Sequence, residues 1–219
     1  AFGFWVGTGV GVTLDFFITE ECLADQTSDS GNIGMQVGEV LTMRQCLLAL
    51  MIRSANDVAT QIAVQIAGSV SAFADMMNQR AQELGCVNTH FVNASGMPDE
   101  NHYTTVYDLY LIFQKALQDE TFYQLISTSS YTTNYTAADG SAKTQDWSST
   151  NQYKTGESKL PDGFTLVGGK TGTTGDAGFC LVLLTDNAGG QPVISIVLKA
   201  DCKSNLYLMM NEILAGCGN

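Results

Sequence analysis

The sequence predicts a mixed α+β fold, in which a helical lobe accompanies an antiparallel sheet. Segments with helical periodicity fill the middle of the chain, whereas short runs rich in β-branched residues fill its last third. Residues 178–185 and 192–200 are two such runs, and they flank a turn of Asp, Asn and Gly that is typical of a hairpin. Helices followed by antiparallel strands and a closing helix, expected over residues 204–214, indicate an α+β domain.

Capping residues mark four further helices, because Thr at an N-cap and Gly just past a last turn satisfy exposed backbone groups. These helices are expected over residues 43–51, 57–67, 71–84 and 106–117, with Thr42, Thr105, Gly68 and Gly85 at their ends. We further expect a strand over residues 12–20, a loop over residues 25–36, and a hairpin with a long loop over residues 128–153.

Charge excludes some classes of partner. The net charge is -12 and the chain has only ten Lys and Arg residues, so a nucleic-acid partner and an anionic membrane surface are both disfavoured. No apolar stretch reaches the roughly 18 residues of a membrane span, so no membrane anchor is expected within this chain. Residues 1–12 (AFGFWVGTGVGV) match no expected element and stay unassigned.

The cysteines favour neither a metal nor a disulfide scaffold. Six Cys residues occur, without a Cys-x-x-Cys pair or a Cys/His cluster of zinc spacing. We therefore expect no metal and no cofactor, and thiols that are mostly free and buried. A pair between Cys202 and Cys217 stays open.

Two short motifs point to chemistry, but each also has decoys in the chain. Ser-x-Asn begins at Ser30, Ser54 and Ser149. Ser54 lies at the break between two expected helices, where Ser54 and Asn56 can face one cleft, whereas the other two serines lie in polar loops and are expected to bond their own backbone.

Lys-Thr-Gly begins at Lys154 and Lys170. Lys170 follows two glycines in a β-type run, which would let a ligand backbone lie close to the strand. Lys154 stands in a polar segment and is expected to be an ordinary surface-loop lysine.

Long stretches of the chain resemble the serine-type D-alanyl-D-alanine carboxypeptidases, the low-molecular-mass penicillin-binding proteins. The resemblance runs from about Thr13 to Ala215 and is longest in LALMIRSANDVATQIAVQIA, LGCVNTHFVNASGMPDENHYTTVYD and VGGKTGTTGDAGFCLVL. It implies a β-lactamase/transpeptidase-like fold over residues 13–219, with the first strands and the nucleophile helix of the family missing.

The resemblance also implies roles for the relay residues. Ser54 would relay a proton between the nucleophile, Lys170 and the leaving amine. Asn56 would bind the peptide carbonyl of the substrate. Lys170 would add positive field, which an anionic substrate end requires.

The remaining site residues follow Lys170. Thr171 would bind the terminal carboxylate, Gly172 would let the substrate approach, and the N–H of Thr173 would be one oxyanion donor. The implied partners are peptidoglycan stem peptides ending in D-Ala-D-Ala and β-lactam antibiotics, and the implied location is outside the cytoplasm.

The sequence departs from this family in one respect. No lysine has Ser or Thr three positions before it, so the Ser-x-x-Lys nucleophile is absent from the 219 residues. We consider a fragment of an active enzyme or a pseudoenzyme that binds stem peptides without cleaving them, and favour the fragment.

A class A β-lactamase is another alternative. It requires a deacylating Glu in a Glu-x-x-x-Asn setting before the Lys-Thr-Gly strand, and none of Asp139, Asp146, Glu157 and Asp162 stands in one. A Ser-His-acid triad is disfavoured because no Gly-x-Ser-x-Gly occurs, so His90 and His102 are expected to be hydrogen-bonded loop residues, with Tyr103 and Asp108 supporting the same loop.

Overall fold

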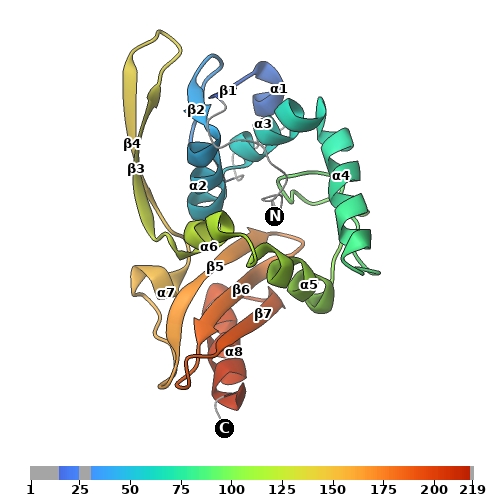
Figure 1. The fold of residues 1–219 in the computed structure, drawn as a ribbon, viewed down its shortest axis with the longest axis vertical. Coiled ribbons are helices and arrows are strands. Elements are labelled where there is room, and N and C mark those ends of the chain that lie inside the picture. The colour runs from blue at the N-terminus through green and yellow to red at the C-terminus, as the bar shows by residue number, and fades with distance from the viewer. Residues whose placement is uncertain (1–14, 25–30, 218–219) are drawn as a thin grey trace.

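The computed structural model describes residues 15–24 and 31–217, which form a helical part above a sheet-based part (Figure 1). Residues 1–14 and 25–30 lie outside the described residues, and with them the unassigned residues 1–12, Ser30 and parts of the expected strand and loop. Of the strand expected over residues 12–20, the described part is a strand only at Asp15–Phe17, and a helix begins at Glu20. The mixed α+β class is confirmed. The antiparallel strands form two sheets instead of one, with strand orders β1-β2-β3-β4 and β5-β6-β7.

The upper sheet is small and lies beside the helical lobe. Its strands are β1 (Asp15–Phe17), β2 (Val40–Thr42), β3 (Ser130–Thr136) and β4 (Ala142–Ser148). The last two form the long hairpin expected after residue 128. The lobe consists of α1 (Glu20–Ala24), α2 (Met43–Arg53), α3 (Asn56–Ala67) and α4 (Val70–Glu83).

The lower sheet is covered on both faces. Its strands are β5 (Thr165–Thr174), β6 (Gly178–Asp186) and β7 (Pro192–Ala200). Apolar residues of β6 and β7 pack on α8 (Lys203–Cys217) on one face. On the other face they pack on α5 (Val106–Ala116) and α6 (Glu120–Ser127). A sheet covered on both faces explains the near-continuous apolar sequence of β6.

Capping fixes the start of α2 and the end of α3, the helices nearest the site. Thr42 and Gln45 form a reciprocal capping box at the start of α2, as the sequence predicts for Thr42. Gly68 ends α3 in the left-handed conformation with φ 83°, which glycine adopts without a steric penalty. The start of α2 and the end of α3 are therefore fixed by local sequence.

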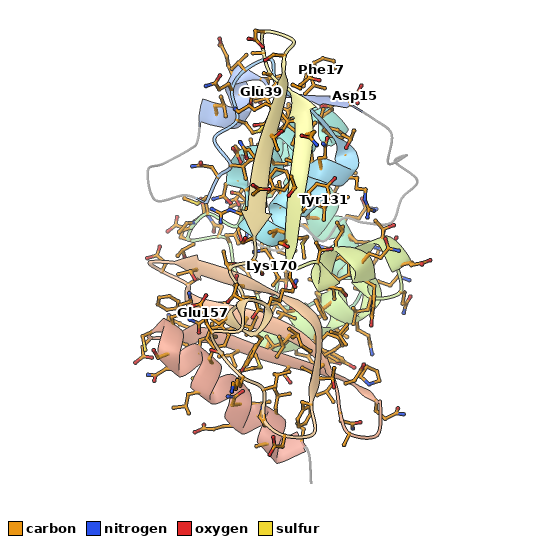
Figure 2. All side chains as sticks on the ribbon, turned by 90° about the vertical axis from the view of Figure 1, so that its left-hand side faces the viewer. Asp15, Phe17, Glu39, Tyr131, Glu157 and Lys170 are labelled. Carbon is orange, nitrogen blue, oxygen red and sulfur yellow. The ribbon has the colours of Figure 1, made fainter. Side chains whose placement is uncertain are left out.

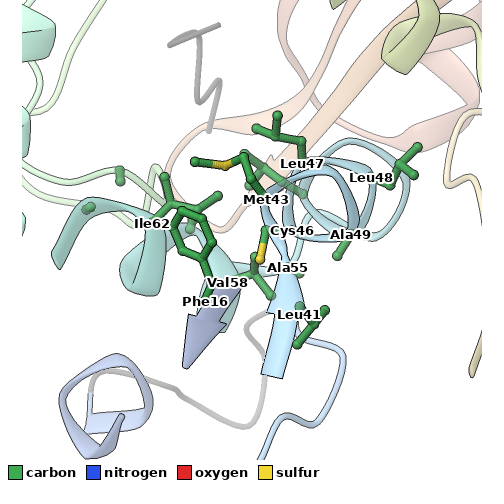
Figure 3. Packing of buried hydrophobic residues seen from close by; sticks show 14 of the residues in the cluster. Phe16, Leu41, Met43, Cys46, Leu47, Leu48, Ala49, Ala55, Val58 and Ile62 are labelled. Carbon is green, nitrogen blue, oxygen red and sulfur yellow. The ribbon is translucent and has the colours of Figure 1, made fainter. Parts of the chain in front are cut away.

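The core of the helical part joins α2 and α3 to the upper sheet. Phe16 of β1, Leu41 of β2, Cys46 of α2 and Val58 of α3 are all buried in one cluster (Figure 3). Burying a Phe or Leu side chain contributes about 1.5–3 kcal/mol relative to leaving it exposed. This packing holds the turn between α2 and α3 in place.

Three short helices are not predicted by the sequence: α1, α6 and α7 (Gln152–Thr155). The cysteine expectation also needs correction. Cys46 and Cys86 are buried free thiols, but Cys180 is half-buried, and Cys202 and Cys217 are exposed and unpaired. No helix among the described residues has the length and apolar character needed to cross a membrane.

The close contact of α6 with β5 gives a stability prediction. A Cβ at Gly168 would lie 2.2 Å from the carbonyl oxygen of Ile126, so Gly168→Ala forces α6 away from the strand. We expect a loss of about 3 kcal/mol or more in the free energy of unfolding, measured by urea denaturation. Gly175→Ala is the control, because a Cβ there meets nothing within 4 Å. Equal effects of the two substitutions would contradict the packing.

Candidate functional site

The turn between α2 and α3 presents Ser54. Ser54 adopts the left-handed conformation, with φ 55° and ψ 42°, and its N–H donates to the carbonyl of Leu50. Ala55 is fully buried and Asn56 begins α3. A non-glycine residue in this conformation is strained, which indicates that its surroundings hold it there.

A loop behind the turn holds this conformation. The N–H of Asn56 donates to the carbonyl oxygen of Gly31 at 2.8 Å. A Cβ at Gly31 would lie 2.8 Å from the carbonyl oxygen of Ser54, so only glycine fits there without displacement. Asp57 accepts hydrogen bonds from the N–H groups of Ile33 and Met35 through its carboxylate, and burial raises its pKa.

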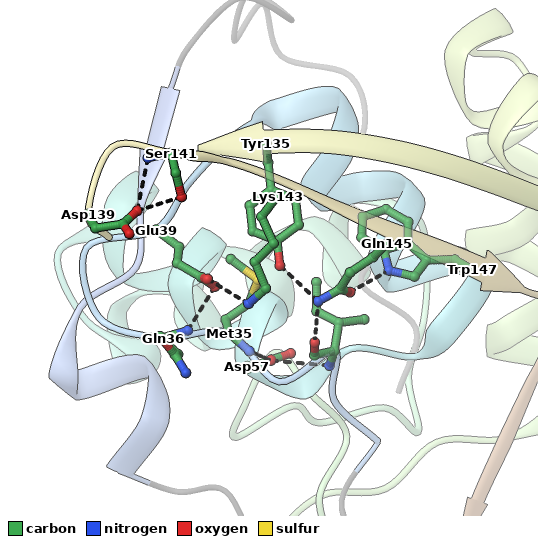
Figure 4. A network of polar contacts seen from close by, with 11 residues as sticks. Met35, Gln36, Glu39, Asp57, Tyr135, Asp139, Ser141, Lys143, Gln145 and Trp147 are labelled. Carbon is green, nitrogen blue, oxygen red and sulfur yellow. Dashed lines mark hydrogen bonds and ion pairs between the residues drawn. The ribbon is translucent and has the colours of Figure 1, made fainter. Parts of the chain in front are cut away.

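The hairpin of β3 and β4 holds the far side of that loop (Figure 4). Gln145 donates through Nε2 to the carbonyl of Ile33 at 3.0 Å and to the hydroxyl of Tyr135 at 2.8 Å. Lys143 pairs with the buried Glu39 at 2.7 Å, and this hydrogen bond raises the pKa of Lys143. The loop is therefore fixed between α3 and the hairpin.

Lys170 reaches the same place from the lower sheet. Lys170 is only 3% exposed and lies on β5 opposite Val182 of β6. Its Nζ donates to Ser54 Oγ and, at 2.6 Å, to the carbonyl oxygen of Thr171. Burial, and then the charge of Lys154, lower the pKa of Lys170 to about 8. Figure 2 shows Lys170 below the β3–β4 hairpin, where the two parts of the molecule meet.

The residues after Lys170 line up along β5. Thr171 and Thr150 share a hydrogen bond of 2.5 Å between their hydroxyls. Gly172 lies opposite Cys180, and the exposed Thr173 opposite Phe179. The strand thus offers a hydroxyl, a position without a side chain and an exposed segment in succession, next to the buried ammonium.

Asn56 meets a different loop. Its Nδ2 donates to the thioether of Met97 at 3.5 Å, and a thioether is a weak acceptor. Asn93 fixes Met97 by donating from Nδ2 to its carbonyl and accepting from the N–H of Gly96. The amide of Asn56 is therefore oriented, yet held by a partner that a stronger acceptor can displace.

Both histidines have the loop roles expected from the sequence. His90 Nδ1 contacts the carbonyl of Asn101 at 2.7 Å, and the backbones of His90 and Tyr103 pair. His102 Nδ1 accepts from the N–H of Val92, and burial lowers its pKa to about 4, which keeps it neutral near pH 7. Asp108 holds the start of this loop by accepting from the N–H of Asn88.

The expectation for Lys154 is wrong. Lys154 lies on the short helix α7, is half-buried, and donates through Nζ to the carbonyl oxygen of Thr128 at 2.8 Å. Ser149 has the expected local role, since its hydroxyl accepts from the N–H of Asn151. Sequence patterns also miss Met97 and Thr150, because their contacts join segments that are distant along the chain.

The arrangement combines four chemical elements on neighbouring segments: a hydroxyl, a buried amine, a carboxamide donor and a strand whose Thr171 hydroxyl pairs with Thr150. An amine that titrates near neutral pH can exchange a proton with the adjacent hydroxyl. A buried cation without a carboxylate partner favours an anionic ligand. The described residues contain no cluster of three His, Cys, Asp or Glu side chains placed to hold a metal ion.

Comparison with known proteins places this geometry in context. The model of the D-alanyl-D-alanine carboxypeptidase family matches residues 12–202. The D-alanyl-D-alanine carboxypeptidase of Streptomyces sp. (strain K15) is 32% identical over 196 residues, which cover 86% of this chain and 64% of that protein. DacF, a D-alanyl-D-alanine carboxypeptidase of Bacillus subtilis (strain 168), is 31% identical over 187 residues, covering 83% of this chain and 44% of that protein.

The fold comparison agrees. The crystal structure of the Streptomyces K15 DD-transpeptidase superposes with a TM-score of 0.86 at 26% identity, covering 97% of this chain and 82% of that one. The chain thus spans 64% and 44% of the length of these two curated relatives, and most of the solved domain.

Proposed function

The chain belongs to the D-alanyl-D-alanine carboxypeptidase family, and on this basis we propose that it provides the substrate cleft and the proton relay of a serine-type D-Ala-D-Ala carboxypeptidase acting on peptidoglycan stem peptides. The observation that carries the proposal is the hydrogen bond from the buried ammonium of Lys170 to the hydroxyl of Ser54. Because peptidoglycan lies outside the cytoplasm, we propose the cell envelope as the place of action.

Recognition of the substrate end rests on β5. The terminal carboxylate of D-Ala-D-Ala binds the hydroxyl of Thr171, close to the positive charge of Lys170. Gly172 leaves room for the substrate backbone beside the strand. Asn56 donates its side-chain amide to the peptide carbonyl of the substrate and releases Met97 as it does so.

Proton transfer rests on the pair across the cleft. An amine with a pKa of about 8 is partly neutral at physiological pH, so Lys170 can accept the proton of Ser54 while Ser54 accepts that of the attacking hydroxyl. The same path, reversed, delivers the proton to the leaving amine of D-Ala. The N–H of Thr173 is one donor to the oxyanion, a contribution of about 3–4 kcal/mol in comparable sites.

These residues supply neither the attacking hydroxyl nor the second donor to the oxyanion, which belongs to the nucleophile. No lysine of the 219-residue sequence has a serine three positions before it, and Ser54 is assigned to the relay. Bound β-lactams, which present a strained amide beside a carboxylate, are expected to use the same contacts as D-Ala-D-Ala.

Binding of stem-peptide ends tests the proposed cleft. We expect the chain to bind an acyl-D-Ala-D-Ala peptide in an NMR or calorimetric titration, and not its L-Ala-L-Ala stereoisomer. Thr171→Val removes a hydrogen bond to a charged group, worth about 1.5–3 kcal/mol, so affinity should fall roughly 10-fold or more.

The matched control is Thr144→Val, which removes an exposed hydroxyl from β4. Binding that ignores the stereochemistry of the peptide, or that weakens equally in both variants, would contradict the proposed cleft.

Covalent labelling tests the role of Ser54. We expect no band on a denaturing gel after the 219-residue chain is incubated with fluorescent penicillin, because it has no Ser-x-x-Lys. A band that disappears in Ser54→Ala would make Ser54 the nucleophile and overturn its relay role. A band that persists in that variant would reveal another nucleophile and refute the expectation that the chain lacks one.

A further inference from the structure

The Lys-Thr-Gly that begins at Lys154 has no part in the function proposed above, yet its lysine points inward. α7 begins at Asn151, whose side chain accepts from the N–H of Tyr153, and Lys154 follows in the single turn of this helix. From there Nζ donates to the carbonyl oxygen of Thr128 at 2.8 Å. Thr128 is the residue that ends α6, so the ammonium of Lys154 is fixed at the carboxyl end of that helix.

The same end of α6 lies directly on the strand that carries Lys170. Ile126 contacts β5 so closely that a Cβ at Gly168 would lie 2.2 Å from its carbonyl oxygen. Gly168 and Lys170 are two residues apart and therefore face the same side of the sheet. Lys170 lies opposite Val182, which packs on Ile126 as well. The ammonium of Lys154 thus lies at the end of α6, and the side chain of Lys170 leaves β5 on the face that α6 covers.

Within residues 15–24 and 31–217, no carboxylate forms an ion pair with either cation. The ion pairs among the described residues are Arg80–Glu83 and Lys143–Glu39, and neither involves Lys154 or Lys170. The neighbours of Lys170 on β6 are apolar. Among the described residues, the surrounding elements carry these ionisable groups: Arg44, Cys46 and Arg53 on α2, Glu120 and Tyr123 on α6, Tyr153 on α7, Glu157 after α7, Cys180 and Asp186 on β6, and Lys203, Tyr207, Glu212 and Cys217 on α8. Glu157 is exposed and bonds Thr155 and Gln152, and Tyr153 bonds Asn211.

We propose that Lys154 is a positioning residue that acts on the site through Lys170: its positive charge, fixed on the carbonyl oxygen of Thr128, opposes the charge of Lys170 and makes the Lys170 amine a better proton acceptor toward Ser54. The value of this for catalysis rests on the proposed function, but the electrostatic coupling of the two lysines does not.

The physical basis is repulsion between like charges where water is scarce. Two ammonium groups in a partly desolvated region disfavour each other's charged form, so one of them loses its proton more easily. Burial lowers the pKa of Lys154 to about 8, and burial together with the charge of Lys154 lowers that of Lys170 to about 8. Both lysines therefore titrate in the same pH range, as a coupled pair.

A purely structural role has a different signature. A cation at the carboxyl end of a helix stabilises that helix through its dipole, and Lys154 could act on α6 in this way alone. In that case the charge of Lys154 would affect unfolding but not the titration of Lys170. The two roles are therefore separated by measuring the protonation of Lys170 itself.

The test is an NMR titration of the whole chain with ¹³Cε-labelled lysine, without any ligand. In the unsubstituted protein we expect the Lys170 signal to titrate in two coupled steps. Lys154→Gln keeps a donor for Thr128 and removes the charge. In this variant Lys170 should titrate in one step, about one pH unit above the lower of its two values in the unsubstituted protein. In Lys154→Arg, whose charge is permanent, it should titrate in one step at or slightly above the lower of the two original values.

An identical Lys170 titration in the unsubstituted protein and in Lys154→Arg would overturn the proposal. The arginine variant keeps the cation on α6, so this comparison stands even if Lys154→Gln does not fold. Because the titration contains no peptide or β-lactam, a failure of the proposed function leaves its outcome unchanged. Conversely, a coupled titration in a protein that does not bind D-Ala-D-Ala would refute the function and support the coupling.

Discussion

The structure depends on one buried hydrogen bond between two parts of the molecule. Lys170 brings an almost fully buried ammonium from the lower sheet to the hydroxyl of Ser54, which is 116 positions away in the sequence. A buried ammonium without partners is strongly disfavoured, so this contact, with that to the carbonyl of Thr171, determines where the two parts must meet. The proposed substrate site lies at this junction for that reason.

Holding this contact requires local departures from favourable geometry. Ser54 occupies a left-handed conformation that costs on the order of 1 kcal/mol or more for a residue with a side chain. Because Gly31 has no side chain, the loop can pass against the carbonyl oxygen of Ser54. Asp57 on α3 fixes that loop by accepting a hydrogen bond from it. Compensated strain of this kind clusters at functional sites, although Lys199 on β7, outside this site, also has a positive φ.

Much of this arrangement could be predicted from sequence. Local sequence predicts the helices that carry caps, such as Thr42 at α2 and Thr105 at α5. It also predicts the hairpin turn after Asp186. The choice of Ser54 and Lys170 among their decoys also follows from local context, since one lies at a helix break and the other in a glycine-flanked strand.

The remaining features depend on tertiary packing. α6 and α7 have eight and four residues, too few to show a clear period, and their formation depends on contacts with β5 and α8. Lys154 points inward only because the end of α6 lies 26 positions before it in the sequence but within hydrogen-bonding distance. Met97 reaches Asn56 across 41 positions for the same reason.

The central claim, that Ser54 and Lys170 form one unit, is tested most directly by a double-mutant cycle on the affinity for an acyl-D-Ala-D-Ala peptide. The substitutions are Ser54→Ala, Lys170→Gln and both together. If the two side chains act through their mutual hydrogen bond, the effects will not add, and the coupling energy will be about 1 kcal/mol or more. Additivity to within about 0.3–0.5 kcal/mol would mean that the residues act independently, and the account would be wrong.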